Sequence, residues 1–267
     1  MGRGGILKNL SIVYLILFLL FTVQISAAGD IQILTAVSIE GNKNISEEEI
    51  LTYIESIPGE IFDGEKIKDD MERVYDSGYF LDVTVSLEYY SGGLKAVFEV
   101  KEYPVLLDTL LEGNSIYSKE ELLSLAELEI GQVLNLNKLI KARNSIIEKY
   151  HNDGYILAAY SEINLSDEGI ITLLIDEGTI NEVIITGNEK TKDHVIRREL
   201  EFNTGEIFNK KKIEKSMYNL YQLNYFKEVK PRLERVGETN RADIVIDVVE
   251  DETRKWIGGV SYHSKEG

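Results

Sequence analysis

Three times along the chain, hydrophobic and polar residues follow the same order. Each repeat opens with a short run in which apolar and polar residues alternate, and closes with two more such runs, as expected for strands buried on one face. Val83, Val85 and Leu87 belong to one of these runs. Between the runs, apolar residues recur at helical spacing, as at Ile67 and Val74. The pattern predicts a β-α-α-β-β unit of the α+β class, in which two helices cover one face of a three-stranded sheet.

Glycine positions mark the repeats most clearly. Each first run ends in a Gly-Asn pair, and another glycine follows 18 residues after the first one. The pairs begin at Gly41, Gly113 and Gly187, and the later glycines are Gly59, Gly131 and Gly205. Glycine and asparagine both tolerate positive φ, so each pair is predicted to turn the chain at the end of a strand.

The middle repeat is longer than the other two. Tyr79-Phe80 recurs as Tyr225-Phe226 at the same offset as the glycines, whereas the middle equivalent, Tyr155-Ile156, comes four residues late. We therefore expect a four-residue insertion in the middle repeat.

Helix starts can also be read from the chain. Ser46 with Glu49, and Ser118 with Glu121, have the capping-box spacing that satisfies free amides at the start of a helix. A favoured N-cap residue precedes the second helix of each repeat. These residues are Asp63, Asn135 and Asn209.

The charge balance narrows the possible functions. The 267 residues include 46 acidic and 29 basic side chains, which gives a formal net charge of −17. This charge argues against nucleic-acid binding, which depends on basic contacts to phosphate. The lack of cysteine excludes disulfides and thiolate metal sites. The three histidines lie far apart and no catalytic motif occurs, so we expect no enzyme activity, no cofactor and no metal site.

Residues 1–28 have the features of a secretory signal peptide. Two basic residues come first, an apolar run follows, and Ser26-Ala27-Ala28 supplies small residues for cleavage. A retained membrane anchor is the alternative. Its apolar run of 14 residues is shorter than the roughly 20 needed to cross a bilayer.

Together these features resemble POTRA domains. Three units lie in tandem behind an export signal, and each has a strand ending in Gly-Asn and a central Gly-[Glu/Gln]-[Ile/Val]-[Phe/Leu] motif. Gly78-Tyr79-Phe80 and Gly154-Tyr155-Ile156 add a third shared motif before the second strand. The resemblance implies POTRA domains at residues 34–102, 103–177 and 178–251, joined by the short linkers 103–104 and 178–179, at which hinge motion is expected.

Residues 252–267 resemble the start of a barrel. Trp256 to Tyr262 look like a first β-barrel strand after the last POTRA domain, as in the BamA/TamA type of outer-membrane protein assembly factor. The rest of that barrel is missing from this sequence, so we expect a fragment of a longer protein. A truncated remnant without a barrel is the alternative.

The resemblance also implies a function and partners. POTRA domains of that family lie in the periplasm and receive unfolded outer-membrane proteins, and the barrel inserts those clients into the outer membrane. Expected partners are therefore unfolded clients, accessory assembly subunits and the outer membrane itself through the missing barrel, with no nucleic acid. The alternative is a periplasmic POTRA scaffold, of cell-division type or without a barrel, that lacks insertase activity. A retained N-terminal anchor would favour the cell-division type.

The second strand of each unit is the candidate binding site. Pro231 lies inside such a strand, and proline favours sheet edges because it cannot donate to a ladder. An open edge can accept a guest strand through main-chain hydrogen bonds, at residues 82–90, 158–165 and 226–236. Proline and charges that merely protect the edge are the alternative. The candidate residues are Val83, Val85, Leu87, Ile163, Leu165, Val229, Pro231 and Leu233.

Overall fold

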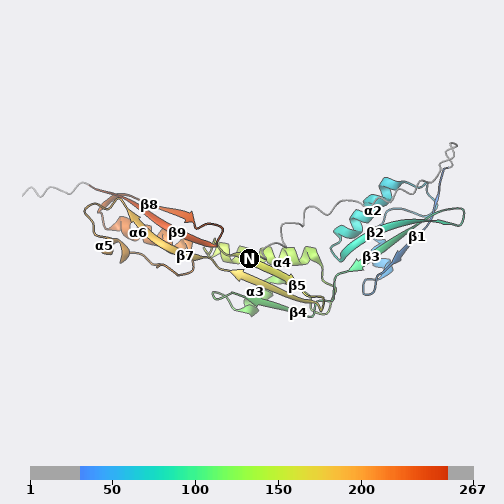
Figure 1. Cartoon of the computed structure of the whole chain (residues 1–267), viewed down its shortest axis with the longest axis horizontal. Helices are drawn as coiled ribbons and strands as arrows, with labels where there is room; N and C mark the ends of the chain where they lie inside the picture. Colours follow the sequence, from blue (N-terminus) through green and yellow to red (C-terminus); the bar gives the residue numbers. More distant parts are fainter. Residues whose placement is uncertain (1–30, 252–267) are drawn as a thin grey trace, which may run out of the picture.

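The computed structural model describes residues 31–251. They form three α+β units that follow one another along the long axis of the molecule (Figure 1). The predicted fold class is therefore confirmed. The predicted signal peptide at residues 1–28 and the predicted barrel start at residues 252–267 lie outside the described residues.

Each unit has the element order predicted from the repeat. The first unit contains β1 (Leu34–Glu40), α1 (Glu47–Leu51), α2 (Gly64–Asp76), β2 (Phe80–Tyr90) and β3 (Gly93–Glu102). The second contains β4 (Asp108–Glu112), α3 (Lys119–Ala126), α4 (Leu136–Asn152), β5 (Ala159–Leu165) and β6 (Ile170–Asp176). The third contains β7 (Thr179–Thr186), α5 (Asp193–Arg197), α6 (Lys210–Gln222), β8 (Phe226–Arg235) and β9 (Arg241–Glu250).

The insertion predicted in the middle repeat lies in its second helix. Helix α4 has 17 residues, whereas the equivalent α2 and α6 have 13 each. The difference of four residues is close to one helical turn. The inserted turn lengthens the helix without changing the order of elements.

The three sheets share one topology. The strand orders are β1-β3-β2, β4-β6-β5 and β7-β9-β8. The third strand of each unit is central, parallel to the first strand and antiparallel to the second. The first and second strands are therefore both edge strands.

Each unit is built around its own hydrophobic core on one face of its sheet. In the first unit, Ile50 of α1 and Val74 of α2 join Phe98 of β3 in one fully buried cluster. The equivalent residues are Leu122, Ile146 and Leu173 in the second unit, and Ile196, Leu220 and Ile246 in the third. Burial of this apolar surface is the main force that holds each unit together.

The predicted helix caps are present. The Ser46 hydroxyl accepts the amide of Glu49, and the Ser118 hydroxyl accepts the amide of Glu121. The third unit differs, because α5 begins after Lys192, which makes no side-chain cap.

Candidate strand-addition edges

The strands with the candidate residues all lie at sheet edges. β2, β5 and β8 each pair with only one neighbour within the described residues. Pro231 of β8 stands opposite Ile246 of β9, so the edge position inferred from this proline is confirmed. Client binding at these residues stays a prediction.

The opposite edge of each sheet is partly covered by the unit's own chain, which the sequence analysis missed. In the first unit the connection between α1 and α2 runs along the start of β1. The Leu34 amide donates to the Glu60 carbonyl at 2.9 Å, and the Gly59 amide donates to the Leu34 carbonyl at 2.7 Å. The central glycine motif therefore pairs with the first strand and occupies main-chain groups that a guest would need.

The same pairing recurs in the other two units. Leu106, two residues before β4, exchanges main-chain hydrogen bonds with Gln132 and Gly131, and Ile180 of β7 exchanges them with Glu206 and Gly205. The repeated Gly-[Glu/Gln]-[Ile/Val]-[Phe/Leu] motif was the available signal for this cover. Its effect is to leave β2, β5 and β8 as the more open edges.

The candidate side chains divide into two groups by exposure. Most of them serve the core, because Val83 is buried and Val85, Ile163, Leu165 and Val229 are partly buried against their units' core clusters. Leu87, Pro231 and Leu233 are exposed instead. These three can touch a guest strand directly, whereas the first group can act only through the position of the strand.

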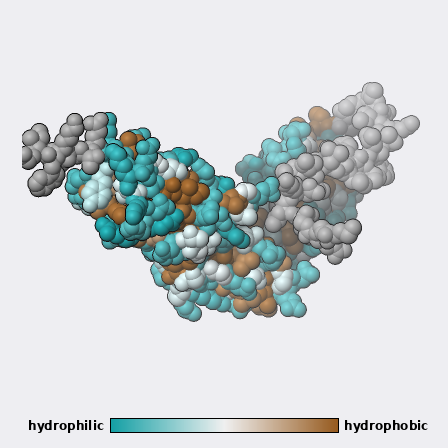
Figure 2. All heavy atoms as spheres, turned by 60° about the vertical axis from the view of Figure 1, so that its left-hand side comes forward, coloured by the Kyte–Doolittle hydropathy of each residue, from teal (hydrophilic) through white to brown (hydrophobic). Residues whose placement is uncertain are grey.

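The far end of β2 is the most apolar part of the three open edges. Leu87 is 47% exposed and Tyr89 is 78% exposed, although both lie on the same sheet face as the buried Val83. They extend past the part of the sheet that the helices cover. The face of the molecule drawn in Figure 2 is mostly hydrophilic, and its hydrophobic residues lie in separate groups.

Strand β8 has a different surface. On its solvent face, Arg232 pairs with Asp247 of β9 and with Glu234. Hydrogen bonds from Arg232 and then from Thr186 lower the pKa of Asp247 to about 2. These polar contacts extend across all three strands of the sheet, so this part of its solvent face is polar.

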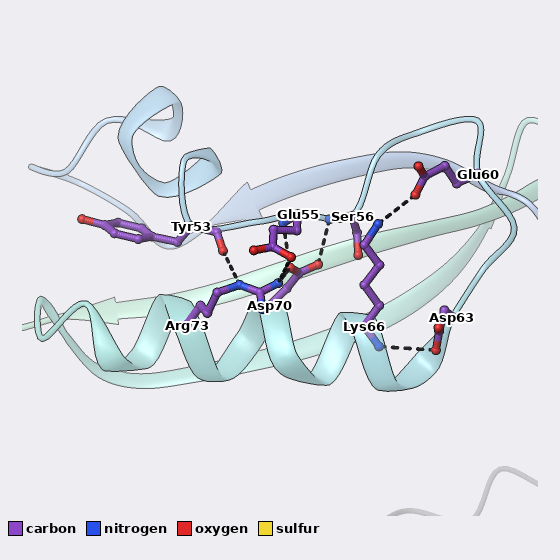
Figure 3. A network of polar contacts seen from close by, with 8 residues as sticks. All are labelled: Tyr53, Glu55, Ser56, Glu60, Asp63, Lys66, Asp70 and Arg73. Atoms are coloured by element: carbon purple, nitrogen blue, oxygen red, sulfur yellow. Dashed lines mark hydrogen bonds and ion pairs between the residues drawn. The ribbon is translucent and has the colours of Figure 1, made fainter.

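A buried carboxylate in the first unit has a structural role (Figure 3). Asp70 of α2 is fully buried and accepts the amides of Glu55 at 2.7 Å and Ser56 at 3.1 Å. It also pairs with Arg73, whose Nε donates to the Tyr53 carbonyl at 3.1 Å. Both carboxylate oxygens have partners, so the group ties α2 to the connection after α1.

A glutamate at the end of each third strand anchors a loop, and the sequence analysis missed this as well. Glu102 accepts the amides of Lys43, Asn44 and Ile45. Burial alone raises the pKa of Glu102, but the hydrogen bonds from these three residues outweigh it, so the pKa is lowered from its ordinary value.

The same arrangement occurs twice more. Glu177 accepts the amides of Ser115 and Ile116, and Glu250 accepts the amides of Lys190 and Thr191. The signal in the sequence was a glutamate at the end of each repeat. These carboxylates are held in structural bonds with backbone amides.

Three further observations concern the described part of the chain, residues 31–251. No group of three or more His, Asp or Glu side chains there is arranged to hold a metal ion. Among those residues, no helix combines the length and the apolar character that crossing a membrane requires. His151, one of the three histidines, contacts the Ala158 carbonyl through Nε2 at 3.0 Å.

The fold and the repeated motifs place the chain in a known family. The family model described as POTRA, surface antigen variable number repeat, matches residues 33–103, 108–178 and 179–251. The chain belongs to this family.

Its relatives narrow the class further. The chain is 30% identical over 258 residues to the outer membrane protein assembly factor BamA of Nitratidesulfovibrio vulgaris. This alignment covers 85% of the chain and 32% of the relative. It is 26% identical over 259 residues to BamA of Neisseria meningitidis, in an alignment that covers 82% of the chain and 31% of the relative. The chain spans about a third or less of the length of the curated relatives it matches. These matches define a BamA-type POTRA region.

Solved structures agree with this assignment. The N-terminal domain of Omp85 from Thermosynechococcus elongatus matches with a TM-score of 0.74 and 25% identity, covering 83% of this chain and 98% of that structure. POTRA domains 1–3 of the periplasmic domain of Omp85 from Anabaena match with a TM-score of 0.67 and 22% identity, covering 83% and 96%. The second likeness concerns the fold alone.

Proposed function

We propose that this chain is the periplasmic receiving region of an outer-membrane protein assembly factor of BamA type. Its POTRA units accept extended segments of unfolded outer-membrane proteins by strand addition and pass them to a membrane-embedded barrel. The role is non-enzymatic, and accessory assembly subunits are further partners. The observation that supports it best is that one edge of each sheet is open while the other is partly covered by the unit's own chain.

Strand addition suits this chemistry. A guest strand obtains its affinity from main-chain hydrogen bonds, which are the same for every sequence, and its selectivity from alternate side chains. One edge can therefore receive many unrelated clients. This is what an assembly factor with a varied set of barrel clients requires.

Strand β2 is the strongest candidate among the three edges. Outer-membrane strands alternate apolar and polar residues, so one face of an incoming strand is apolar. On β2, Leu87 and Tyr89 offer exposed apolar surface on the helix-covered face of the sheet, beside main-chain groups that have no second partner strand among the described residues. A guest strand on β2 would extend that face.

Site-specific crosslinking tests the proposal. A photoreactive residue at Leu87, on the open edge, should crosslink to unfolded outer-membrane proteins during their export. The matched control is Glu40, which is exposed on β1 at the opposite edge. Equal client crosslinking from both positions would remove the preference for the open edge, and crosslinks only to folded periplasmic proteins would favour the scaffold role instead.

A further inference from the structure

The joints between consecutive units are built on one repeated asparagine. At the first joint, Asn135 caps α4, because its Oδ1 accepts the amides of Asn137 at 3.0 Å and Lys138 at 3.1 Å. Its Nδ2 points to the preceding unit and donates to the Ser77 carbonyl at 2.8 Å. A single side chain therefore satisfies its own helix and holds the end of the helix before it.

The second joint repeats this arrangement. Oδ1 of Asn209 accepts the amides of Lys211 at 2.9 Å and Lys212 at 3.3 Å, and Nδ2 donates to the Asp153 carbonyl at 3.2 Å. The residue after each asparagine adds a main-chain bond across the joint. Leu136 donates to the Gly78 carbonyl at 2.8 Å, and Lys210 donates to the Gly154 carbonyl at 2.7 Å.

Glycine lies on the other side of each joint, in a backbone conformation that favours it. Gly78 has a φ of +84°, and a Cβ there would stand 2.9 Å from Oδ1 of Asn135. Gly154 has a φ of +98°, and a Cβ there would stand 2.8 Å from Oδ1 of Asn209. Both the backbone conformation and the close approach of the asparagine disfavour a larger residue there.

The first and third units supply the contrast. Asp63 takes the N-cap position of α2 and accepts the amides of Glu65 and Lys66 in the same way, but an aspartate has no N–H to donate to a neighbouring carbonyl. In the third unit, Asn224 stands where the other two have the joint glycine, with a φ of 55°. An asparagine at the N-cap and a glycine after the preceding helix thus occur together at both joints between the described units.

We infer that Asn135 and Asn209 are positioning residues that fix the orientation of each POTRA unit on the one before it. The cap alone does not require asparagine, since Asp63 performs it equally well. Asparagine differs from aspartate in its Nδ2 donor, and that donor bonds only to the preceding unit. The inference goes beyond strand addition and does not depend on it, although the joints set how the open edges of successive units are aligned.

An Asn→Asp exchange separates the two roles. In Asn135→Asp and Asn209→Asp, the helix cap is retained, but a carboxylate oxygen faces a carbonyl oxygen across the joint. Spin-label distances between adjacent units of the full chain should broaden or shift, while the helix content stays unchanged. Asp63→Asn is the matched control, and there the distances between units should not change.

Amide exchange gives a second readout that a cap alone would not move. The amides of Leu136 and Lys210 donate across the joints. Loss of the asparagine Nδ2 hydrogen bond should speed the exchange of these amides roughly tenfold, as for loss of about one hydrogen bond. Protonation of the introduced carboxyl at low pH restores a donor and should bring the exchange of these amides back to that of the natural chain measured at the same pH. Unchanged distances and unchanged exchange in both variants would overturn the inference, whatever happens to client crosslinking.

Discussion

Leu157 of the second unit lies in the same buried cluster as Ile180 of the third unit. Its equivalent in the first unit, Leu81, is 42% exposed. The hairpin of the third unit adds a second anchor on this side, because Nδ2 of Asn240 donates to the carbonyls of Leu157 at 2.8 Å and Asp176 at 3.1 Å. The second joint is therefore held by burial as well as by hydrogen bonds.

The exchange Leu157→Ala should destabilise the third unit, although the residue belongs to the second. A cavity in a core of this kind costs about 2 to 5 kcal/mol of unfolding free energy. Hydrogen exchange resolved by unit should show the loss of protection in β7 to β9. Leu81→Ala is the control and should stay within about 0.5 kcal/mol. Equal effects of the two exchanges would contradict the assignment of Leu157 to the third core.

Removal of the buried carboxylate in the first unit should be costly. Asp70→Ala leaves the amides of Glu55 and Ser56 without their acceptor, and each buried amide that loses its acceptor costs about 1 to 3 kcal/mol. Chemical denaturation should show the effect in the first unit. The neighbouring Asp69 is exposed, so Asp69→Ala should be nearly neutral. A stable Asp70→Ala variant would mean that the network contributes little.

Acid should weaken the loop anchor of Glu102. The pKa of this carboxyl is lowered in the folded state from its ordinary value of 4.5, so it stabilises the fold above that value. The contribution is lost as the pH falls through the lowered pKa. Thermal unfolding followed from about pH 6 to about pH 3 should show a steeper loss of stability for the natural chain than for Glu102→Gln. Parallel curves would show that the anchor does not depend on charge.

A second proline in β8 should block a guest strand and preserve the sheet. Successive residues of a strand point their amides to opposite sides. Because Pro231 has no amide to donate, its nitrogen is expected to face away from β9. Val229 is two residues away, so its amide points to the same outer side. Val229→Pro should therefore reduce client crosslinking to this edge without unfolding the unit, and Leu233→Pro should do the same. Lys230→Pro removes an amide on the β9 side and should destabilise the unit instead. Unchanged crosslinking in a folded Val229→Pro variant would exclude strand addition at β8.

The sequence predicted the features that depend on short spacing. Period-two alternation at Val83 to Leu87, the capping pairs and the late Tyr155 are all readable within a few residues, and the structure has the strand, the caps and the longer helix. The open edge was also predictable, because Pro231 restricts its strand whatever surrounds it. The exact unit boundaries and the binding role of the edge residues stay predictions.

What the sequence analysis missed depends on residues far apart in the chain. Glu102 meets its loop nearly sixty positions away, since it is separated from Ile45 by 57 positions along the chain. A terminal glutamate looks like ordinary surface charge until the fold brings that loop to it. The exposure of Leu81 and the burial of Leu157 likewise depend on whether the next unit packs against them.

The covered edge of each sheet also sets a direction. The connection between the two helices already pairs with the start of β1 and of β7 and with Leu106 just before β4. The more open edges, at which a sheet would gain strands, therefore lie beyond β2, β5 and β8. A guest added there becomes the new outermost strand, and its free side can take up the next segment of the same client. Such a hybrid sheet would grow mainly from one edge, and each POTRA unit would be its fixed starting point rather than a link between two growing sheets.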